Sequence, residues 1–375
     1  MASSTRRLTW PWCRVSALSK SPVSPNICLL NSFHMNTNTE AIPAMSVLAL
    51  LGPTAVGKTA LSLRIAEEFS CEIISLDSMQ VYRRMNIGTA KIRPEEQRGI
   101  AHYCLDLVEP DEDYDAARYA RDATAAMAAI RQHGKIPFLV GGAGLYLRAL
   151  EQGLFAAPSV DKGIRIELLK QLDREGIEKL HDELAICDPE SAARIDRHDR
   201  SRVLRALEIY RATGVAWPEH LRRQRLVGEQ NQAMVNHAAN RFIKIGLDCP
   251  RDQLYRRIDE RCLAMLAEGL IGETRELLAA GYSRQCKALN AIGYRHVIAW
   301  LAGDIQYEKM LEFFMRDTRR YAKRQFTWFR HDPAVTWFDW QEDDAVLEFI
   351  AETLNASVIG CVRNPPHCPI STLCR

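Results

Sequence analysis

Short apolar runs alternate with amphipathic stretches along the first part of the chain. Continuous apolar runs, typical of strands buried on both faces, occur at 47–51, 72–76 and 136–142. Stretches with apolar residues at helical spacing follow them at 59–69, 116–132 and 145–150. Because strands that alternate with helices form parallel sheets covered on both faces, the pattern predicts an α/β fold.

The pattern changes after Pro158, where charged and helically periodic sequence continues to residue 235 without a strand-like run. Within it, "RIELLKQLDREGIEKLHDELA" predicts a pair of amphipathic helices. An apolar run at 241–248 predicts that the sheet resumes, and long helices follow it. We therefore predict four regions, which are an N-terminal extension at 1–44, an α/β core at 45–158 and 238–345, a helical insertion at 159–237, and a C-terminal tail at 346–375.

Composition narrows the class of protein. The chain has 375 residues, of which 47% are hydrophobic and 26% charged, and its net charge of +2 is close to neutral. Any nucleic-acid binding must therefore depend on local basic patches. No apolar run approaches the roughly 18 residues that span a bilayer, so we expect no membrane partner. The 11 cysteines are scattered, which is typical of reduced thiols in a cytosol-like compartment.

The first 44 residues are rich in Ser, Pro and Arg, and their first acidic residue is Glu40. We interpret them as a disordered extension, or as the result of a start codon placed too early, with Met35 or Met45 as the true start. The alternative is an organelle transit peptide, which has this composition. We predict a cytoplasmic protein, with a mitochondrial transit peptide as the alternative.

The segment Gly52 to Thr59 reads G-x-x-x-x-G-K-T between a predicted strand and a predicted helix. Loops of this kind bind phosphates with backbone N–H groups and the positive end of the following helix. Lys58 is placed to reach the terminal phosphates, and the Thr59 hydroxyl to hold Mg²⁺. The loop predicts a diphosphate or triphosphate ligand but does not specify the reaction.

Asp77 follows the second predicted strand, at the sheet edge where parallel sheets bind ligands. It can hold Mg²⁺ through water, act as a general base, or cap the turn that begins at Ser78. The third strand ends in the glycine-rich "GGAG", Gly141 to Gly144, where a hydrolytic phosphate-loop protein would have an acid. This argues against an ordinary ATPase, although the glycines also suit close packing of strand and helix.

Basic and aromatic residues gather in "MRDTRRYAKRQFTWFR", residues 315–330, where Arg316, Arg319, Arg320, Lys323 and Arg324 recur at helical spacing. Such a face can bind a phosphate backbone while the adjoining aromatics stack on unpaired bases. A solvated face over a core aromatic cluster explains the pattern equally well. Arg202 and Arg205 form a second basic pair with the same two interpretations.

The tail contains Cys361, His367, Cys368 and Cys374, but it has no C-x-x-C pair and two prolines interrupt it. We therefore do not predict a zinc site there.

Six motifs in order give the sequence a family resemblance. "GPTAVGKT", "ISLDSMQVYRRMNIGTAK", "PFLVGGAGLYLRAL", "DRSRVLRALEIY", "AIGYR" and "YAKRQFTWFR" resemble those of the tRNA dimethylallyltransferases, also called tRNA isopentenyltransferases or the IPP transferase family. The resemblance covers residues 47–330 and implies a P-loop NTPase-like parallel sheet core with a helical insertion. It also implies transfer of a dimethylallyl group from dimethylallyl diphosphate to the exocyclic amine of an adenosine. That adenosine lies 3′ of the anticodon in tRNAs that read codons starting with U.

The resemblance also assigns roles to residues. Asp77 would be the catalytic base and Lys58 would act on the leaving diphosphate, with Mg²⁺ on Thr59. The residues implied to bind the diphosphate are Gly52, Pro53, Thr54, Ala55, Val56, Gly57, Lys58, Thr59 and Arg261, with Arg257 beside them. Those implied to bind the tRNA anticodon stem-loop are Asp77, Ser78, Met79, Gln80, Ala143, Arg165, Ser201, Arg202, Val203, Leu204, Arg205, Asn290, Ala291, Ile292, Gly293, Tyr294, Arg295, Lys323, Arg324, Gln325, Phe326, Thr327, Trp328, Phe329 and Arg330. We expect a monomer.

The sequence departs from the family pattern at several positions. Ala143 replaces a threonine whose hydroxyl would contact the target adenosine and assist Asp77. Catalytic efficiency is expected to suffer unless water or Ser78 substitutes for that hydroxyl. Arg84, Asn86 and Ile92 replace Gly, Asp and Pro, which predicts a looser loop beside the site. Two alternatives to the transferase remain. The phosphate loop and Asp77 also suit a small-metabolite kinase that uses ATP, and Ala143 suits a catalytically weak tRNA-binding homologue.

Overall fold

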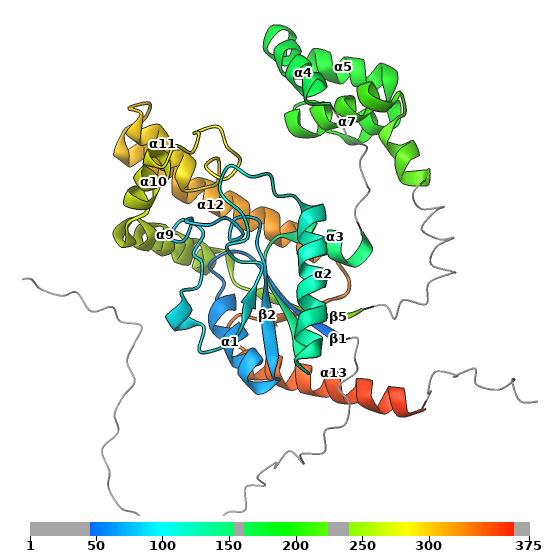
Figure 1. Ribbon diagram of the computed structural model, residues 1–375, viewed down its shortest axis with the longest axis vertical. Coiled ribbons are helices and arrows are strands. Elements are labelled where there is room, and N and C mark those ends of the chain that lie inside the picture. Colours follow the sequence, from blue (N-terminus) through cyan, green and yellow to red (C-terminus); the bar gives the residue numbers. More distant parts are fainter. Residues whose placement is uncertain (1–45, 154–160, 224–239, 364–375) are drawn as a thin grey trace, which may run out of the picture. The chain divides into compact units, whose positions relative to one another are not determined.

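The computed structural model describes residues 46–153, 161–223 and 240–363. In these residues six parallel strands form one sheet in the order β3-β2-β4-β1-β5-β6 (Figure 1). The strands are β1 (Ser46–Leu51), β2 (Cys71–Leu76), β3 (His102–Tyr103), β4 (Ile136–Gly141), β5 (Arg241–Asp248) and β6 (Val335–Asp339). The predicted α/β fold with a parallel sheet is confirmed.

The helices of the α/β core are α1 (Lys58–Glu68), the 3₁₀ turn η1 (Pro94–Glu96), α2 (Ala116–Gln132), α3 (Gly144–Gln152), α9 (Arg251–Glu268), α10 (Leu270–Ala279), α11 (Tyr294–Leu301), α12 (Tyr307–Arg330) and α13 (Asp343–Arg363). Helix α2 has the bounds that the periodicity predicts, because both of its ends carry local signals. The Asp115 side chain accepts a hydrogen bond from the Arg118 N–H at its start, and Gly134, with φ of 70°, follows its end.

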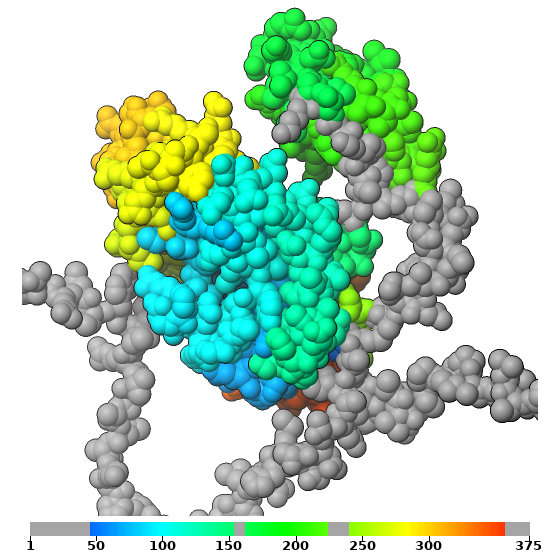
Figure 2. Space-filling view, viewed as in Figure 1, coloured from blue at the N-terminus to red at the C-terminus, as the bar shows by residue number. Residues whose placement is uncertain are grey.

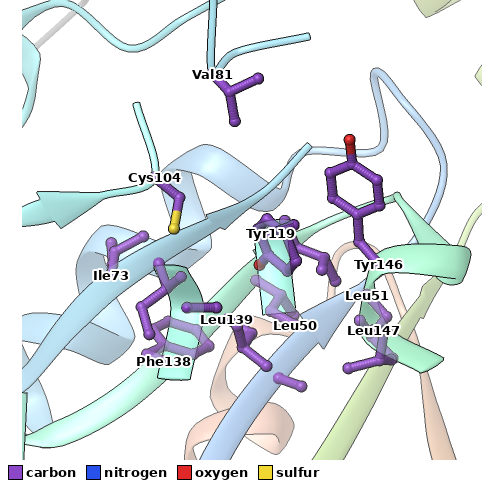
Figure 3. Packing of buried hydrophobic residues seen from close by; sticks show 14 of the residues in the cluster. Leu50, Leu51, Ile73, Val81, Cys104, Tyr119, Phe138, Leu139, Tyr146 and Leu147 are labelled. Atoms are coloured by element: carbon purple, nitrogen blue, oxygen red, sulfur yellow. The ribbon is translucent and has the colours of Figure 1, made fainter. Parts of the chain in front are cut away.

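The core lies on both sides of β1, β2 and β4, as a parallel sheet requires. Leu50 and Leu51 of β1 are fully buried, as are Phe138 and Leu139 of β4. Figure 3 shows these side chains packed beneath the ring of Tyr119. Burial of such continuous apolar strands is the main driving force for this fold.

Residues 162–213 form helices with a hydrophobic cluster of their own. The helices are α4 (Lys162–Glu175), α5 (Ile177–Cys187), α6 (Pro189–Arg194) and α7 (Arg200–Thr213). The predicted helix pair is α4 and α5, which separate at Gly176, where φ is 81°. Leu168, Leu180 and Leu207 are fully buried in this cluster, as an independent helical insertion requires.

The C-terminal prediction needs correction. The tail predicted from residue 346 begins inside α13, where Val346 and Ile350 are fully buried and the helix packs on β5. Strands β3 and β6 were not predicted either. Residues 1–45 lie outside the described residues, as do His367, Cys368 and Cys374 and the side chain of Cys361.

No helix in the described residues is long and apolar enough to cross a membrane.

Candidate active site

Three carboxyl ends of strands form the edge where the predicted site residues meet. The phosphate loop follows β1, the glycine run follows β4, and Asp77 follows β2. Since β4 lies between β1 and β2 in the sheet, the glycine run separates the phosphate loop from Asp77. Small residues thus occupy the floor between a predicted phosphate site and a carboxylate.

The phosphate loop has the tight backbone that its sequence predicts. Gly52 and Gly57 have φ of 152° and 114°, values that L side chains rarely adopt, and Gly57 caps the start of α1. Ala55 also has positive φ, at 66°. The Thr54 N–H is not available to a ligand, because it donates to Oε1 of Gln325 over 2.9 Å. Val56 is fully buried, so its contribution to a ligand is limited to its backbone.

Lys58 is folded back onto this loop. Its Nζ donates to the carbonyl oxygens of Gly52 over 2.9 Å and of Pro53 over 2.7 Å. Burial and, next, the positive charge of Arg261 lower the pKa of Lys58 to about 7, against the opposing effect of Asp77. An ammonium group bonded only to neutral carbonyls and close to a second cation is a strong site for an anion.

Helix α9 presents two arginines to the loop. Arg257 Nε donates to the Ala55 carbonyl over 2.8 Å, and its guanidinium lies 4.3 Å from the ring centroid of Trp340. Burial lowers the pKa of Arg261 against the opposing charge of Asp77, and the charge of Arg261 in turn lowers the pKa of Lys58. The structure therefore brings Arg261 together with the phosphate loop, as the resemblance implies.

Asp77 combines two of the roles considered for it. Its Oδ1 caps the following turn by accepting from the N–H groups of Met79 over 2.7 Å and Gln80 over 3.3 Å. Its Oδ2 has no hydrogen-bond donor among the described residues and is available to a substrate. Gln80 is less available, because its amide bonds Ser75 Oγ over 2.8 Å and the Thr89 carbonyl over 3.2 Å.

Helix α12 packs directly on the glycine run. Gln325 is 5% exposed, and its Nε2 donates to the Gly142 carbonyl over 3.1 Å while its Oε1 accepts from Thr54. A side chain at Gly142 would collide with Gln325, and one at Gly144 with Trp328. Gln325 thus joins the glycine run to the phosphate loop, a role that the sequence did not reveal.

The predicted tRNA segment of α12 divides into an exposed and a buried face. Lys323, Arg324, Thr327, Trp328 and Arg330 are exposed, and Trp328 retains 41% of its accessible surface. Gln325 and Phe329 are buried, so their side chains are not accessible to tRNA in this structure. Phe326 is half-buried, and its ring centroid lies 6.1 Å from that of Trp337. The guanidinium carbon of Arg330 lies 5.0 Å from the ring centroid of Phe326.

The segment Asn290 to Arg295 divides in the same way. Gly293 and Tyr294 are buried, and Tyr294 Oη donates to Glu273 over 2.5 Å, so neither is available to tRNA. Ala291 and Ile292 are partly buried against the core. Asn290 and Arg295 are exposed, and Arg295 pairs with Asp317 over 2.6 Å.

In the helical insertion, the side chains of Val203 and Leu204 are buried in the cluster of that region and are not accessible to tRNA in this structure. Ser201 and Arg202 are exposed. Arg165 and Arg205 bond the two carboxylate oxygens of the buried Glu208, over 2.9 Å and 3.1 Å. One carboxylate therefore holds both guanidiniums in place.

The loop after Asp77 is fixed rather than loosened. Glu273 of α10 accepts from the N–H groups of Asn86 over 2.9 Å, Ile87 over 2.9 Å and Gly88 over 3.2 Å. In Figure 2 the surface of this loop region adjoins that of α10 and α11. Arg84 has φ of 64° where the family has glycine, and its guanidinium lies 3.8 Å from Glu109. The expected loosening is therefore not observed.

Three buried tyrosines, Tyr82, Tyr119 and Tyr146, have hydroxyls without a hydrogen-bond partner among the described residues. The charge of Asp77 acts on the hydroxyls of Tyr119 and Tyr146. Burial raises the pKa of each hydroxyl. The rings of Tyr119 and Tyr146 stack at 4.6 Å, and Figure 3 shows the Tyr146 hydroxyl directed away from Leu50 and Leu51. Sequence analysis did not identify these tyrosines, because their spacing is that of ordinary core residues.

Comparisons of the chain with known proteins agree with the family that its motifs indicate. A family model described as IPP transferase matches residues 80–332, and one described as isopentenyl transferase matches residues 45–113. The chain is 44% identical over 306 residues to the tRNA dimethylallyltransferase of Desulfosudis oleivorans, covering 82% of this chain and 95% of that protein. It is 46% identical over 308 residues to that of Desulfotalea psychrophila, again covering 82% and 95%.

Solved structures agree with the sequence comparisons. A tRNA isopentenylpyrophosphate transferase from Bacillus halodurans is 37% identical, with a TM-score of 0.61 over 85% of this chain and 100% of that one. A eukaryotic dimethylallyltransferase, in a study of its action on tRNA, is 28% identical, with a TM-score of 0.59 over 84% of this chain and 78% of that one.

Proposed function

The chain belongs to the IPP transferase family, and from this premise we propose that it transfers a dimethylallyl group from dimethylallyl diphosphate to tRNA. The acceptor is the exocyclic amine of the adenosine 3′ of the anticodon, in tRNAs that read codons starting with U. The family match favours this transferase over the kinase that uses ATP. The absence of an acid after β4 agrees with it, because no water has to be activated for hydrolysis.

The order of groups along the sheet edge is the observation that carries the proposal. Lys58 and Arg261 form a cationic pole at the end of β1, and the free oxygen of Asp77 lies at the end of β2. The glycine run at the end of β4 lies between them. The diphosphate would bind at the cationic pole and the amine at Asp77, with the five-carbon group over the glycines.

In the reaction, the amine nitrogen forms a bond to the allylic carbon while the bond from that carbon to the diphosphate oxygen breaks. Negative charge increases on the departing diphosphate, where Lys58, Arg261 and the loop N–H groups stabilise it most strongly. Asp77 accepts the proton that the amine loses. Since Oδ1 is held by the turn, Oδ2 is the oxygen placed to accept it.

The donor set fits Mg²⁺ that is held mainly by the substrate. No group of three or more His, Cys, Asp or Glu side chains in the described residues could hold a metal by itself. Mg²⁺ commonly keeps several waters and takes one or two protein ligands plus substrate phosphates. The exposed hydroxyl of Thr59, in the first turn of α1, would supply such a ligand. When bound, the ion neutralises charge on the diphosphate.

For tRNA binding we propose the residues that the structure leaves accessible. On α12 these are Lys323, Arg324, Thr327, Trp328 and Arg330, and elsewhere Ser78, Arg165, Ser201, Arg202, Arg205, Asn290 and Arg295. The target adenosine must leave its stack to reach Asp77, as in other enzymes that act on bases. We also propose a cytoplasmic monomer with the domain boundaries given above, except that α13 belongs to the α/β core and not to a tail.

The decisive experiment is incubation of the full chain with labelled dimethylallyl diphosphate, Mg²⁺ and unmodified tRNA. Label in the target adenosine supports the proposal, and Asp77→Asn should lose it. Tight tRNA binding without product would support the weak homologue, in which Ala143 lacks the hydroxyl that the family has. Consumption of ATP with a small acceptor would support the kinase instead.

A further inference from the structure

The carboxylate of Asp317 on α12 is hydrogen-bonded by basic side chains from α11 and from α12. Asp317 accepts from Arg295 Nη2 over 2.6 Å, from His296 Nε2 over 3.2 Å and from Arg316 Nε over 3.0 Å. Nη1 of Arg320 lies 3.7 Å from it. The Asp317 side chain is only 15% exposed, whereas those of Arg316 and Arg320 are 39% and 65% exposed. The carboxylate thus lies inside, and the guanidiniums face solvent.

The cluster of Arg295, Arg316, Arg320 and Asp317 carries unbalanced positive charge. Burial opposes ionisation of Asp317, but hydrogen bonds from Arg316, Arg295 and His296 outweigh it, so the pKa of Asp317 lies well below its usual range. Burial lowers the pKa of His296, which is therefore neutral near pH 7. No other carboxylate of the described residues pairs with these three guanidiniums. Three cations thus share one anion, and the cluster keeps an excess of positive charge.

The neighbouring groups do not remove this excess. The carboxylate of Glu312 lies one turn before Arg316 and pairs with Lys309 over 2.7 Å. Arg319 points to another side of α12, where it bonds both oxygens of Asp259 over 2.7 Å and 2.8 Å. The Arg316 guanidinium carbon lies over the ring of Phe313, 4.3 Å from its centroid, which is a cation–π contact.

The cluster extends a surface that is already proposed for tRNA. Arg316, Arg320 and Arg324 are four residues apart and therefore share one face of α12. Helix α11 supplies Arg295 from the side, and the two helices pack together (Figure 1). Planar guanidiniums that converge on one solvent-facing spot suit a phosphate group, which they can bind with paired hydrogen bonds.

We propose that Arg295, Arg316 and Arg320 form an additional binding site for the phosphodiester backbone of tRNA, with Asp317 as its positioning residue. The inference rests on the proposed function for the identity of the polyanion. The site lies on α11 and α12, outside the phosphate loop, so it contributes to tRNA binding and leaves the transfer step unaffected.

The first test measures tRNA affinity against salt concentration for Arg316→Ala/Arg320→Ala, with Arg98→Ala as a control. Arg98 is 55% exposed and pairs only weakly, with Glu67 over 3.5 Å. If both arginines contact phosphates, the magnitude of the negative slope of log K against log salt should decrease by about 0.7–0.9 for each residue. The kcat at saturating tRNA should remain within about twofold of the original. A slope equal to that of Arg98→Ala would overturn the site.

The second test distinguishes positioning from simple charge. Asp317→Asn removes a negative charge, so general electrostatics predicts tighter binding of the tRNA polyanion. If Asp317 positions the arginines, the same change should weaken binding by about three- to tenfold, and Asp317→Glu should restore part of it. Tighter binding of Asp317→Asn would refute the positioning role. If that variant does not fold, the arginine variants still decide the site.

The two proposals can fail separately. A wild-type protein that forms no prenylated tRNA, but whose salt slope falls in Arg316→Ala/Arg320→Ala, would refute the reaction and retain the phosphate site. A wild-type protein that prenylates tRNA, with an unchanged slope in the variant, would do the reverse.

Discussion

Gln325→Ala should damage the phosphate loop although Gln325 is outside it. The side-chain amide is the link between the Thr54 N–H and the Gly142 carbonyl, over 2.9 Å and 3.1 Å, and it is 5% exposed. Alanine leaves both backbone groups without their partner. An orphaned buried group costs about 1–3 kcal/mol, so the loss of both partners should lower the free energy of unfolding by about 2–6 kcal/mol.

The same change should weaken binding of dimethylallyl diphosphate, because the loop loses the contact that fixes its first turn. In steady-state assays with tRNA, we expect the KM for the diphosphate to rise by about tenfold, which corresponds to about 1.4 kcal/mol. Gln325→Glu tests the charge separately. It keeps an acceptor for Thr54 but places a negative charge beside the diphosphate, so its KM should rise at least as much.

Gln132→Ala is the matched control, because Gln132 is exposed at the end of α2, just before β4 begins at the opposite edge of the sheet. It should change neither the melting temperature nor either KM. The reasoning fails if Gln325→Ala leaves both the stability and the KM for the diphosphate unchanged. A rise in the KM for tRNA alone would instead return Gln325 to the tRNA interface.

Three further predictions concern the site itself. Burial and Arg261 lower the pKa of Lys58 to about 7, so the free protein loses this positive charge as pH rises above that value. The Kd for dimethylallyl diphosphate should therefore increase from about pH 6 to about pH 9. An equally steep increase of the Kd in Lys58→Arg would contradict this prediction. Asp77→Asn, which keeps the capping oxygen, should lower kcat by at least about 10²-fold without changing the melting temperature, whereas loss of diphosphate binding alone would contradict the base assignment. Trp328→Ala should weaken tRNA binding by about 1–3 kcal/mol, measured by titration with tRNA. Phe329→Ala should lower the free energy of unfolding by about 3–5 kcal/mol, measured by thermal unfolding. Loss of stability in Trp328→Ala and loss of tRNA binding alone in Phe329→Ala would refute both assignments.

Local signals explain what the sequence analysis predicted well. The bounds of α2 follow from a capping aspartate and a terminating glycine, and β1, β2 and β4 follow from continuous apolar runs. Strand β3 has two residues, too few for a pattern. Strand β6, which pairs with β5, was missed although its first four residues are types that favour strands. The start of α13 was missed because its apolar residues were interpreted as part of a tail.

Contacts between distant segments explain what was missed in the site. Glu273 lies in an ordinary amphipathic helix, and only the fold brings it to the N–H groups of Asn86, Ile87 and Gly88. Gln325 was assigned to tRNA because it lies within the segment 323–330, which the family resemblance assigns to tRNA binding as a whole. Its position is nevertheless that of a core residue, since it shares the buried face of α12 with Phe329.

Helix α12 therefore serves two sites through two faces. Its buried face holds the phosphate loop and the glycine run through Gln325, while its exposed face carries Arg324 and Trp328, which we propose for tRNA. A helix is rigid across one turn, so a displacement caused by tRNA on one face must also move the amide on the other face. Since that amide fixes Thr54, occupancy of the tRNA surface is expected to change affinity for the diphosphate, and by linkage the diphosphate must change affinity for tRNA by the same factor.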